Sequence, residues 1–315
     1  LSLVGDIGGT NSRFGLIEPG SVAVQDIEAH KNDDYASLED AAHAYLDKRK
    51  ITSLAAAAIA VAGPIMSDEF MLTNRDWLIS RKNLKAALNA RTIRLLNDFE
   101  ALALSLPHLK PEDLAQVGGE VHKKPALKLV LGPGTGLGMA ALAPLPGGGW
   151  QALPGELGHI TLPVVTREEF DLREAMTEPG TMFESEFAVT GGGLLLIYRT
   201  IAKMAGRTPV LSTPEDVLQA GLKKSDADAV KTLHHFIIWL ARLAGDAAMM
   251  MQAHGGVYLA GGIAPSIIGE LRAGPFRHTF DDKGRLTHVM KPIPIYVIVD
   301  RFPALKGCAA SLQNI

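Results

Sequence analysis

Gly132-Pro133-Gly134-Thr135-Gly136-Leu137-Gly138 follows a short apolar run, and a similar turn, Asp6-Ile7-Gly8-Gly9-Thr10-Asn11, follows Leu3-Val4 near the start of the chain. Glycine has no Cβ, so the backbone N–H groups of such turns can approach a bound anion, and threonine adds a hydroxyl donor. Either turn alone is more typical of a simple hairpin. Because the turns recur in different halves of the chain, the pair favours two loops that hold the phosphates of one nucleotide.

Two common glycine motifs of nucleotide-binding proteins fit poorly. A P-loop requires Lys followed by Ser or Thr after its last glycine, whereas Leu137-Gly138-Met139 follows Gly136. A Rossmann fingerprint requires Gly-x-Gly-x-x-Gly, but Leu137 stands at the third glycine position. The P-loop is therefore excluded and the dinucleotide-binding motif is disfavoured.

Composition and charge narrow the class of protein. The 315 residues are enough for two lobes, and the net charge of −3 provides no attraction to nucleic acid or to an anionic membrane. The longest apolar stretch, residues 54–62, is about half as long as a bilayer crossing requires, so we expect a buried strand. The single cysteine, Cys308, excludes an internal disulfide and a multi-cysteine zinc site. We expect a cytoplasmic protein that binds a small molecule and neither nucleic acid nor membrane.

Strands alternate with helices along the chain, which is typical of an α/β fold. In the first third of the chain, the pattern of apolar and turn residues predicts a hairpin over residues 3–17, a helix over 38–49 and a strand over 92–96. The later part predicts a strand over 127–131, a long helix over 230–251, and a third glycine turn at Gly261-Gly262, after which Pro265 starts a helix. We assign residues 1–107 together with 300–315 to a small lobe, and residues 108–299 to a large lobe.

Asn97 and Asp98 lie where a predicted strand meets a predicted helix. Asn and Asp at such a position are commonly helix N-caps, which is one interpretation. The functional interpretation uses the same geometry, because a carboxylate at the positive end of a helix stays ionised and can accept a proton from a hydroxyl. Both interpretations remain open from local sequence.

Glu156 and His159 lie three residues apart in the segment Pro154 to His159, a predicted turn flanked by small residues. A solvated loop and a metal pair are alternatives, although a metal site would need further ligands nearby. A carboxylate acceptor beside an imidazole suits the hydroxyl groups of a polyol better. Glu186, which precedes Val189-Thr190-Gly191, has the alternative of an ordinary exposed helix glutamate.

Five of these segments, in their order and spacing, resemble the bacterial ATP-dependent glucokinases. They are LVGDIGGTNSR (3–13), LNDF (96–99), LGPGTGLG (131–138), LPGELGH (153–159) and LAGGIAP (259–265), and the resemblance also includes TNRDW (73–77) and FDDKGR (280–285). The chain lacks the zinc-binding cysteine cluster of the related repressor and sugar kinase branch, so it resembles the zinc-free branch. Leu157 departs from the family, which usually has a small residue there, and this leaves sugar affinity in question.

The resemblance implies the hexokinase and actin-like fold, an α/β architecture of two ribonuclease H-like lobes with an interlobe cleft. It implies ATP and Mg²⁺ as cofactors, with Asp6 near the metal through water, and a homodimer. The ATP-binding residues that it implies are Asp6, Gly8, Gly9, Thr10, Asn11, Gly134, Thr135, Gly136, Gly261 and Gly262. The glucose-binding residues that it implies are Asn97, Asp98, Glu156, His159 and Glu186.

The expected activity is transfer of the γ-phosphoryl group of ATP to the 6-hydroxyl of glucose, with Asp98 as the catalytic base. Two alternatives are a sugar-sensing regulator built on the same fold and a non-catalytic ATP-binding switch of the actin type. Such a switch would keep the glycine turns but would not need Asp98, Glu156 and His159 together.

Overall fold

The computed structural model describes residues 1–63, 65, 67–72, 75–121 and 124–313, so Thr73 and Asn74 of the 73–77 motif lie outside the described residues. The chain divides into two compact units. Unit 1 comprises Leu1–Lys110, Gly149–Pro154 and Asp300–Ile315, and unit 2 comprises Pro111–Gly148 and Gly155–Val299. Both units combine helices with a sheet, which confirms the predicted α/β class.

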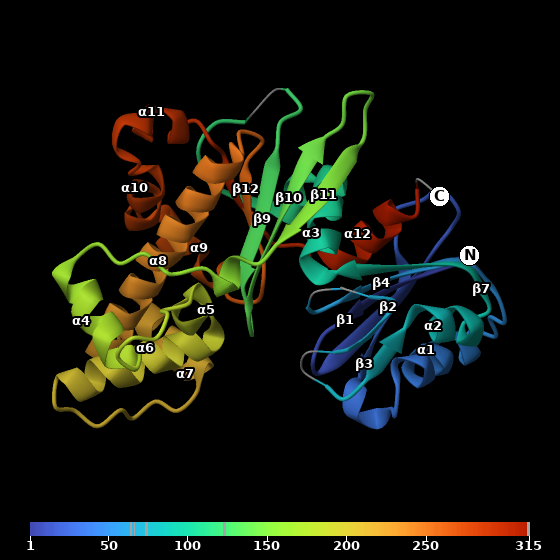
Figure 1. Ribbon diagram of the computed structural model, residues 1–315, viewed down its shortest axis with the longest axis horizontal. Helices are drawn as coiled ribbons and strands as arrows, with labels where there is room; N and C mark the ends of the chain where they lie inside the picture. The colour runs from blue at the N-terminus through green and yellow to red at the C-terminus, as the bar shows by residue number, and fades with distance from the viewer. Residues whose placement is uncertain (64, 66, 73–74, 122–123, 314–315) are drawn as a thin grey trace. The chain divides into compact units, whose positions relative to one another are not determined.

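Unit 1 is built on a five-stranded sheet of order β3-β2-β1-β4-β7 (Figure 1). Its strands are β1 (Ser2–Ile7), β2 (Asn11–Ile17), β3 (Gln25–Lys31), β4 (Leu54–Val61) and β7 (Ala90–Asn97). The β1–β2 and β2–β3 pairs are antiparallel, so the predicted hairpin is confirmed. The β1–β4 and β4–β7 pairs are parallel, so the carboxyl ends of these three strands share one edge of the sheet.

Helices cover both faces of this sheet because its strands alternate apolar side chains between the faces. Leu3 packs with α1 residues such as Tyr45 in one buried cluster, whereas Val4 packs with Leu305 in another. The helices are α1 (Leu38–Asp47), α2 (Arg81–Ala87), α3 (Asp98–Ser105) and α12 (Pro303–Ser311). A separate hairpin consists of β5 (Glu69–Met71) and β6 (Leu78–Ser80).

Unit 2 is built on a six-stranded sheet of order β11-β10-β9-β12-β13-β8. The strands that lie in unit 2 are β8 (Leu114–Gly118), β9 (Lys128–Pro133), β10 (Leu137–Pro144), β12 (Val257–Leu259) and β13 (Ile295–Ile298). The remaining strand of the sheet, β11 (Trp150–Gly155), belongs to unit 1 except for Gly155. Strands β9 and β10 form an antiparallel hairpin, and β12 runs parallel to both β9 and β13. The carboxyl ends of β9 and β12 therefore lie side by side.

The helices of unit 2 pack around one long buried helix. They are α4 (Arg167–Met176), α5 (Ser185–Ala188), α6 (Gly191–Met204), α7 (Pro214–Lys223), α8 (Ala227–Met251), α9 (Ile268–Arg272), α10 (Pro275–Asp281) and α11 (Thr287–Met290). Phe236, Leu240 and Ala244 of α8 are fully buried at helical spacing, which confirms the predicted core helix. Asp226 caps α8 by accepting a hydrogen bond from the backbone N–H of Ala229.

The segment after the third glycine turn differs from the sequence prediction. Pro265 lies in a 3-10 turn, η5 (Ala264–Ile267), and the α-helix begins only at Ile268. Tight 3-10 turns are frequent at the start of α-helices, and proline fits their fixed φ angle.

The predicted apolar strand over 54–62 is present as β4. Among the described residues, no helix has both the length and the apolar composition that a bilayer crossing requires.

Candidate functional site

The first glycine turn joins β1 to β2 at one end of the hairpin in unit 1. The turn closes through a hydrogen bond from the Gly8 N–H to the Asn11 carbonyl, with an N···O distance of 3.0 Å. Asp6, near the end of β1, faces Arg13 on β2 across 3.5 Å. Burial raises the pKa of the Asp6 carboxyl, and the charge and hydrogen bond of Arg13 oppose that rise. Arg13, which is not among the predicted site residues, is thus a charged neighbour of this carboxylate.

Asn97 is the N-cap of α3, so the capping interpretation is confirmed for this residue. Its Oδ1 accepts hydrogen bonds from the N–H groups of Phe99 and Glu100, and its Nδ2 donates to the carbonyl of Gly63. Asp98 is the first residue of the helix and is half-buried, and its Oδ1 accepts from the Phe99 N–H at 3.0 Å. The positive end of α3 therefore holds the carboxylate of Asp98.

The register of the sheet brings the first glycine turn and Asp98 to the same edge of unit 1. Ile7 at the end of β1 is paired with Val61 at the end of β4, and Val61 is paired with Asn97 at the end of β7. Neighbouring strands lie about 4.8 Å apart, so the ends of β1 and β7 are about 10 Å apart across β4. Within unit 1, these two predicted groups are thus close neighbours.

The second glycine turn is the connection between β9 and β10 in unit 2. Gly134 donates its N–H to the carbonyl of Gly136 at 2.8 Å, and its own carbonyl accepts from the N–H of Gly191 at 3.0 Å. Gly191 begins α6, so the turn is tied to the start of that helix. Thr135, at the tip, is exposed.

The third glycine turn lies directly beside the second one. The Ala260 N–H donates to the Leu131 carbonyl at 2.9 Å, continuing the β9–β12 pairing. A Cβ on Gly132 would lie 2.2 Å from the Ala260 carbonyl oxygen, and one on Gly261, where φ is +85°, would lie 2.4 Å from the Pro133 oxygen. Only glycine permits this approach of the two backbones. The structure thus brings Gly134–Gly136 and Gly261–Gly262 together.

Glu156 directly precedes a short 3-10 turn, η4 (Leu157–His159), His159 is its last residue, and both side chains are exposed. The Nδ1 of His159 lies 3.1 Å from the Oε2 of Glu184, a residue that sequence analysis did not select. This hydrogen bond, together with the charges of Glu186, Glu184 and Glu156, raises the pKa of the imidazole. Leu157 is buried in the core of unit 2, so its side chain attaches the turn to that core.

Glu186 connects this turn to the second glycine turn. Its Oε2 accepts a hydrogen bond from the Leu137 N–H at 2.9 Å. A Cβ on Gly136 would lie 2.8 Å from that oxygen, and a Cβ on Gly158 would lie 3.0 Å from it. Glu186 is half-buried and hydrogen-bonded, so the alternative of an exposed helix glutamate is wrong. Unit 2 therefore gathers the carboxylate-rich turn and two glycine turns in one region.

The architecture is that of the hexokinase and actin-like sugar kinases. The structure is similar to that of a glucokinase from an Antarctic psychrotroph, with a TM-score of 0.89 and 29% identity over 100% of this chain and 99% of the other. It has the same fold as a ROK family glucokinase from Streptomyces griseus in complex with glucose and AMPPNP, with a TM-score of 0.68, 17% identity and complete coverage of both chains.

The sequence comparisons identify the family within that class. The glucokinase family model matches residues 3–315. The chain is 40% identical to a glucokinase of Brucella abortus over 309 residues, which are 98% of this chain and 90% of the relative. The chain belongs to the glucokinase family, as its sequence motifs predict.

Proposed function

We infer that the protein is an ATP-dependent glucokinase, which transfers the γ-phosphoryl group of ATP to the 6-hydroxyl of glucose and releases glucose 6-phosphate and ADP. The observation that carries this conclusion is the family match over residues 3–315. The positions of the described residues are consistent with this activity at the proposed base, the sugar-binding residues and the nucleotide-binding turns.

Asp98 is proposed to act as the general base. In phosphoryl transfer the protein contributes mainly positioning and charge stabilisation, and an aspartate accepts the proton of the attacking hydroxyl. A helix N-terminus favours a negative charge, and the β1–β4–β7 register supports this role because it brings Asp98 and the first glycine turn to the same edge of the sheet. No covalent intermediate with the protein is needed.

Glucose is proposed to be held by Asn97, Asp98, Glu156, His159 and Glu186. The S. griseus structure contains glucose, which supports a sugar site in this fold. Carboxylates accept hydrogen bonds from sugar hydroxyls, and the imidazole can donate or accept. Glu184 is proposed to orient His159 for that contact, since the two side chains are hydrogen-bonded.

ATP is proposed to bind through the glycine turns. The residues proposed for this role are Asp6, Gly8, Gly9, Thr10, Asn11, Gly134, Thr135, Gly136, Gly261 and Gly262. The S. griseus structure contains AMPPNP, which supports a nucleotide site in this fold. The close approach of β9 and β12 supports a joint role for the second and third turns.

The residues present fit a Mg²⁺ ion that accompanies the nucleotide. Mg²⁺ is usually held by one or two carboxylates, water and substrate phosphates, and Asp6 supplies a carboxylate beside a glycine turn. Burial disfavours the charge of Asp6, and a divalent cation would offset that cost. When bound, the ion would neutralise charge on the phosphates, while Asp6 holds it through water.

Three further proposals follow from membership of the family. Residues 1–107 with 300–315 are proposed to be the small lobe and residues 108–299 the large lobe; units 1 and 2 differ from this division at residues 108–110 and 149–154, which belong to unit 1. The resemblance to glucokinases supports a homodimer, which sedimentation velocity of the purified protein would test. A cytoplasmic location is proposed on the single, buried cysteine, and fractionation of cells that express the protein would test it.

The test of the function is formation of ADP by the purified protein with ATP and Mg²⁺, in the presence and absence of glucose. A glucokinase forms ADP only when the sugar is added. A panel of mannose, fructose, N-acetylglucosamine and galactose, and of ATP, ADP and polyphosphate, then defines the substrate range. ADP formation that does not depend on any hexose, or no turnover at all with glucose, would instead favour the regulatory alternative.

A further inference from the structure

One buried asparagine outside the predicted site forms hydrogen bonds to three successive residues of the first glycine turn. Asn32 is fully buried and begins the short turn η1 (Asn32–Asp34) directly after β3. Its Nδ2 donates to the carbonyls of Gly8 at 2.8 Å and Gly9 at 3.1 Å. Its backbone N–H donates to the carbonyl of Thr10 at 2.9 Å. Three successive carbonyls of the turn thus accept hydrogen bonds from this one residue.

A second buried side chain completes the hydrogen bonding of the Asn32 amide. The hydroxyl of Ser12, also fully buried, donates to the Oδ1 of Asn32 at 2.7 Å. The opposite amide orientation would place Oδ1 against the carbonyls of Gly8 and Gly9, acceptor against acceptor. These two carbonyls therefore decide that Asn32 donates to the turn, and Ser12 supplies the donor that the buried amide oxygen then needs.

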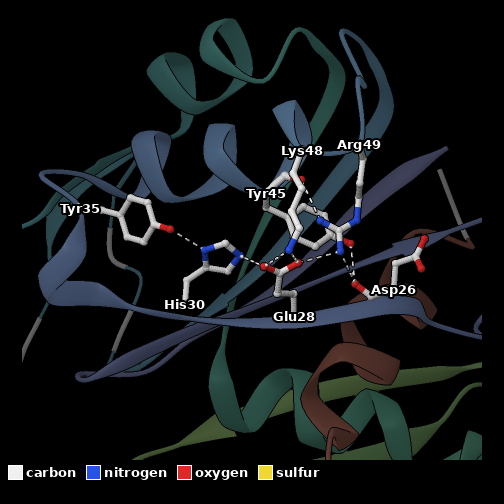
Figure 2. Close-up of polar contacts among 7 residues, drawn as sticks. All are labelled: Asp26, Glu28, His30, Tyr35, Tyr45, Lys48 and Arg49. Carbon is white, nitrogen blue, oxygen red and sulfur yellow. Dashed lines mark hydrogen bonds and ion pairs between the residues drawn. The ribbon is translucent and has the colours of Figure 1, made fainter.

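The segment that carries Asn32 is fixed on both sides by the polar network in Figure 2. His30, two residues before Asn32, is hydrogen-bonded through Nδ1 to the hydroxyl of Tyr35, three residues after it, at 2.7 Å. Glu28, farther back on β3, accepts hydrogen bonds from Lys48 and Arg49 at the end of α1. These hydrogen bonds hold the end of β3 in place, and Asn32, which follows β3 directly, contacts the glycine turn from there.

We propose that Asn32 is a positioning residue for nucleotide binding, because it sets the direction of the N–H groups in the first glycine turn. In a trans peptide the C=O and N–H point in opposite directions. Since the carbonyls of Gly8 and Gly9 point to Asn32, the N–H groups of Gly9 and Thr10 point away from it, the orientation that an anion-binding turn needs. The proposal rests on the function inferred above, and it adds a determinant of affinity for the nucleotide phosphates.

The test compares Asn32→Asp and Ser12→Ala with the wild type. Aspartate keeps the shape of Asn32 and still accepts from Ser12, but it has no NH₂ to donate to the turn. We expect the Kd for ATP, measured by calorimetric titration without sugar, to rise about tenfold in Asn32→Asp and about threefold in Ser12→Ala, in line with the cost of unpaired buried groups. The KM for ATP should rise in parallel, while the KM for glucose stays within about twofold.

Ser80→Ala is the matched control, because it removes another buried hydroxyl of unit 1 that bonds to Glu69 at the β5–β6 hairpin. Thermal unfolding of every variant is measured beside the titrations. An ATP Kd that stays at the wild-type value in both Asn32→Asp and Ser12→Ala, or that changes equally in Ser80→Ala, overturns the proposal. If Asn32→Asp does not fold, Ser12→Ala decides the question alone.

The titration also separates this proposal from the proposed function. A wild-type protein that binds ATP but does not phosphorylate glucose would contradict the function, and the variants would still show whether Asn32 controls nucleotide binding. A wild-type protein that does not bind ATP would overturn both conclusions.

Discussion

At the residue scale, the environment of a carboxylate decides what it can do, and Asp98 occupies the first position of α3. A helix N-terminus favours the ionised form, which a general base requires. Asn97, the preceding residue, uses its own side chain to cap the helix and leaves the first helical position to Asp98. The two neighbouring polar residues therefore have different structural roles.

Asp98→Asn is predicted to lower kcat by about 10²- to 10⁴-fold, because an amide cannot accept the proton of the sugar hydroxyl. Glucose binding should persist, since the amide can still hydrogen-bond to a hydroxyl. Steady-state kinetics and a separate glucose titration measure the two effects. Glu100→Gln, in the same turn of α3, is the control and should keep near-normal turnover. Equal losses in both variants would contradict the assignment of Asp98.

Glu184→Gln is predicted to lower the pKa of His159 from its raised value toward the ordinary 6.5. The reason is that the hydrogen bond that the His159 ring donates to Glu184 is the largest cause of the rise. At neutral pH a smaller fraction of the imidazole would then carry a proton. An NMR titration of the histidine ring signals measures the shift, with Glu178→Gln on the surface as the control. An unchanged His159 titration in Glu184→Gln would show that the pair does not form.

At the element scale, the close approach of β9 and β12 depends on glycine. Gly132→Ala is predicted to destabilise the protein by about 1–3 kcal/mol, the usual cost of overpacking a filled interior. The added Cβ would lie 2.2 Å from the Ala260 carbonyl oxygen. Gly147→Ala is the matched control, because no atom lies within 4 Å of its added Cβ. Denaturant unfolding compares the two, and equal stability would contradict the packing described for this edge.

The buried histidine of α8 makes stability depend on pH. Burial lowers the pKa of His235 from its ordinary value of 6.5, and Glu168, His234, Lys231 and Glu169 also act on it. The unfolded chain therefore takes up this proton at a higher pH than the folded chain does. The contribution is fully present above about pH 6.5 and is lost as the pH falls from there through the folded pKa.

His235→Gln is predicted to flatten the part of the stability curve that lies just below pH 6.5. The wild-type slope that one such proton adds is at most about 1.4 kcal/mol per pH unit. Urea unfolding at a series of pH values measures both curves. Parallel curves for the two proteins would show that His235 does not titrate differently on folding.

At the scale of the whole molecule, the sequence predicts local features well and long-range neighbours poorly. The glycine turns and the strands before them are local, since glycine content and apolar runs identify them. The placement of the Asp98 helix beside the first glycine turn depends on the β1–β4–β7 register, which no local spacing reveals. The sequence shows that β9 and β12 both end in glycine turns, but it does not show directly that these two turns lie side by side.

Two residues of the candidate site could not be found from sequence. In the sequence, Glu184 is a polar residue with no distinguishing motif before a short helix. Only the structure reveals its hydrogen bond to His159. Asn32 lies in a polar Asn-Asp-Asp segment that is typical of a solvated loop, yet it is fully buried. Its burial follows from the pairing of β2 with β3, which is again a long-range property.

The central claim is that the 6-hydroxyl of the sugar attacks the terminal phosphate of ATP. The most direct measurement compares glucose with 6-deoxyglucose, which lacks that hydroxyl, in the same reaction mixture followed by ³¹P NMR. We expect equal amounts of ADP and a sugar 6-phosphate with glucose, and no ADP above background with 6-deoxyglucose. Comparable ADP formation with both sugars, or a phosphate on another position of glucose, would contradict it.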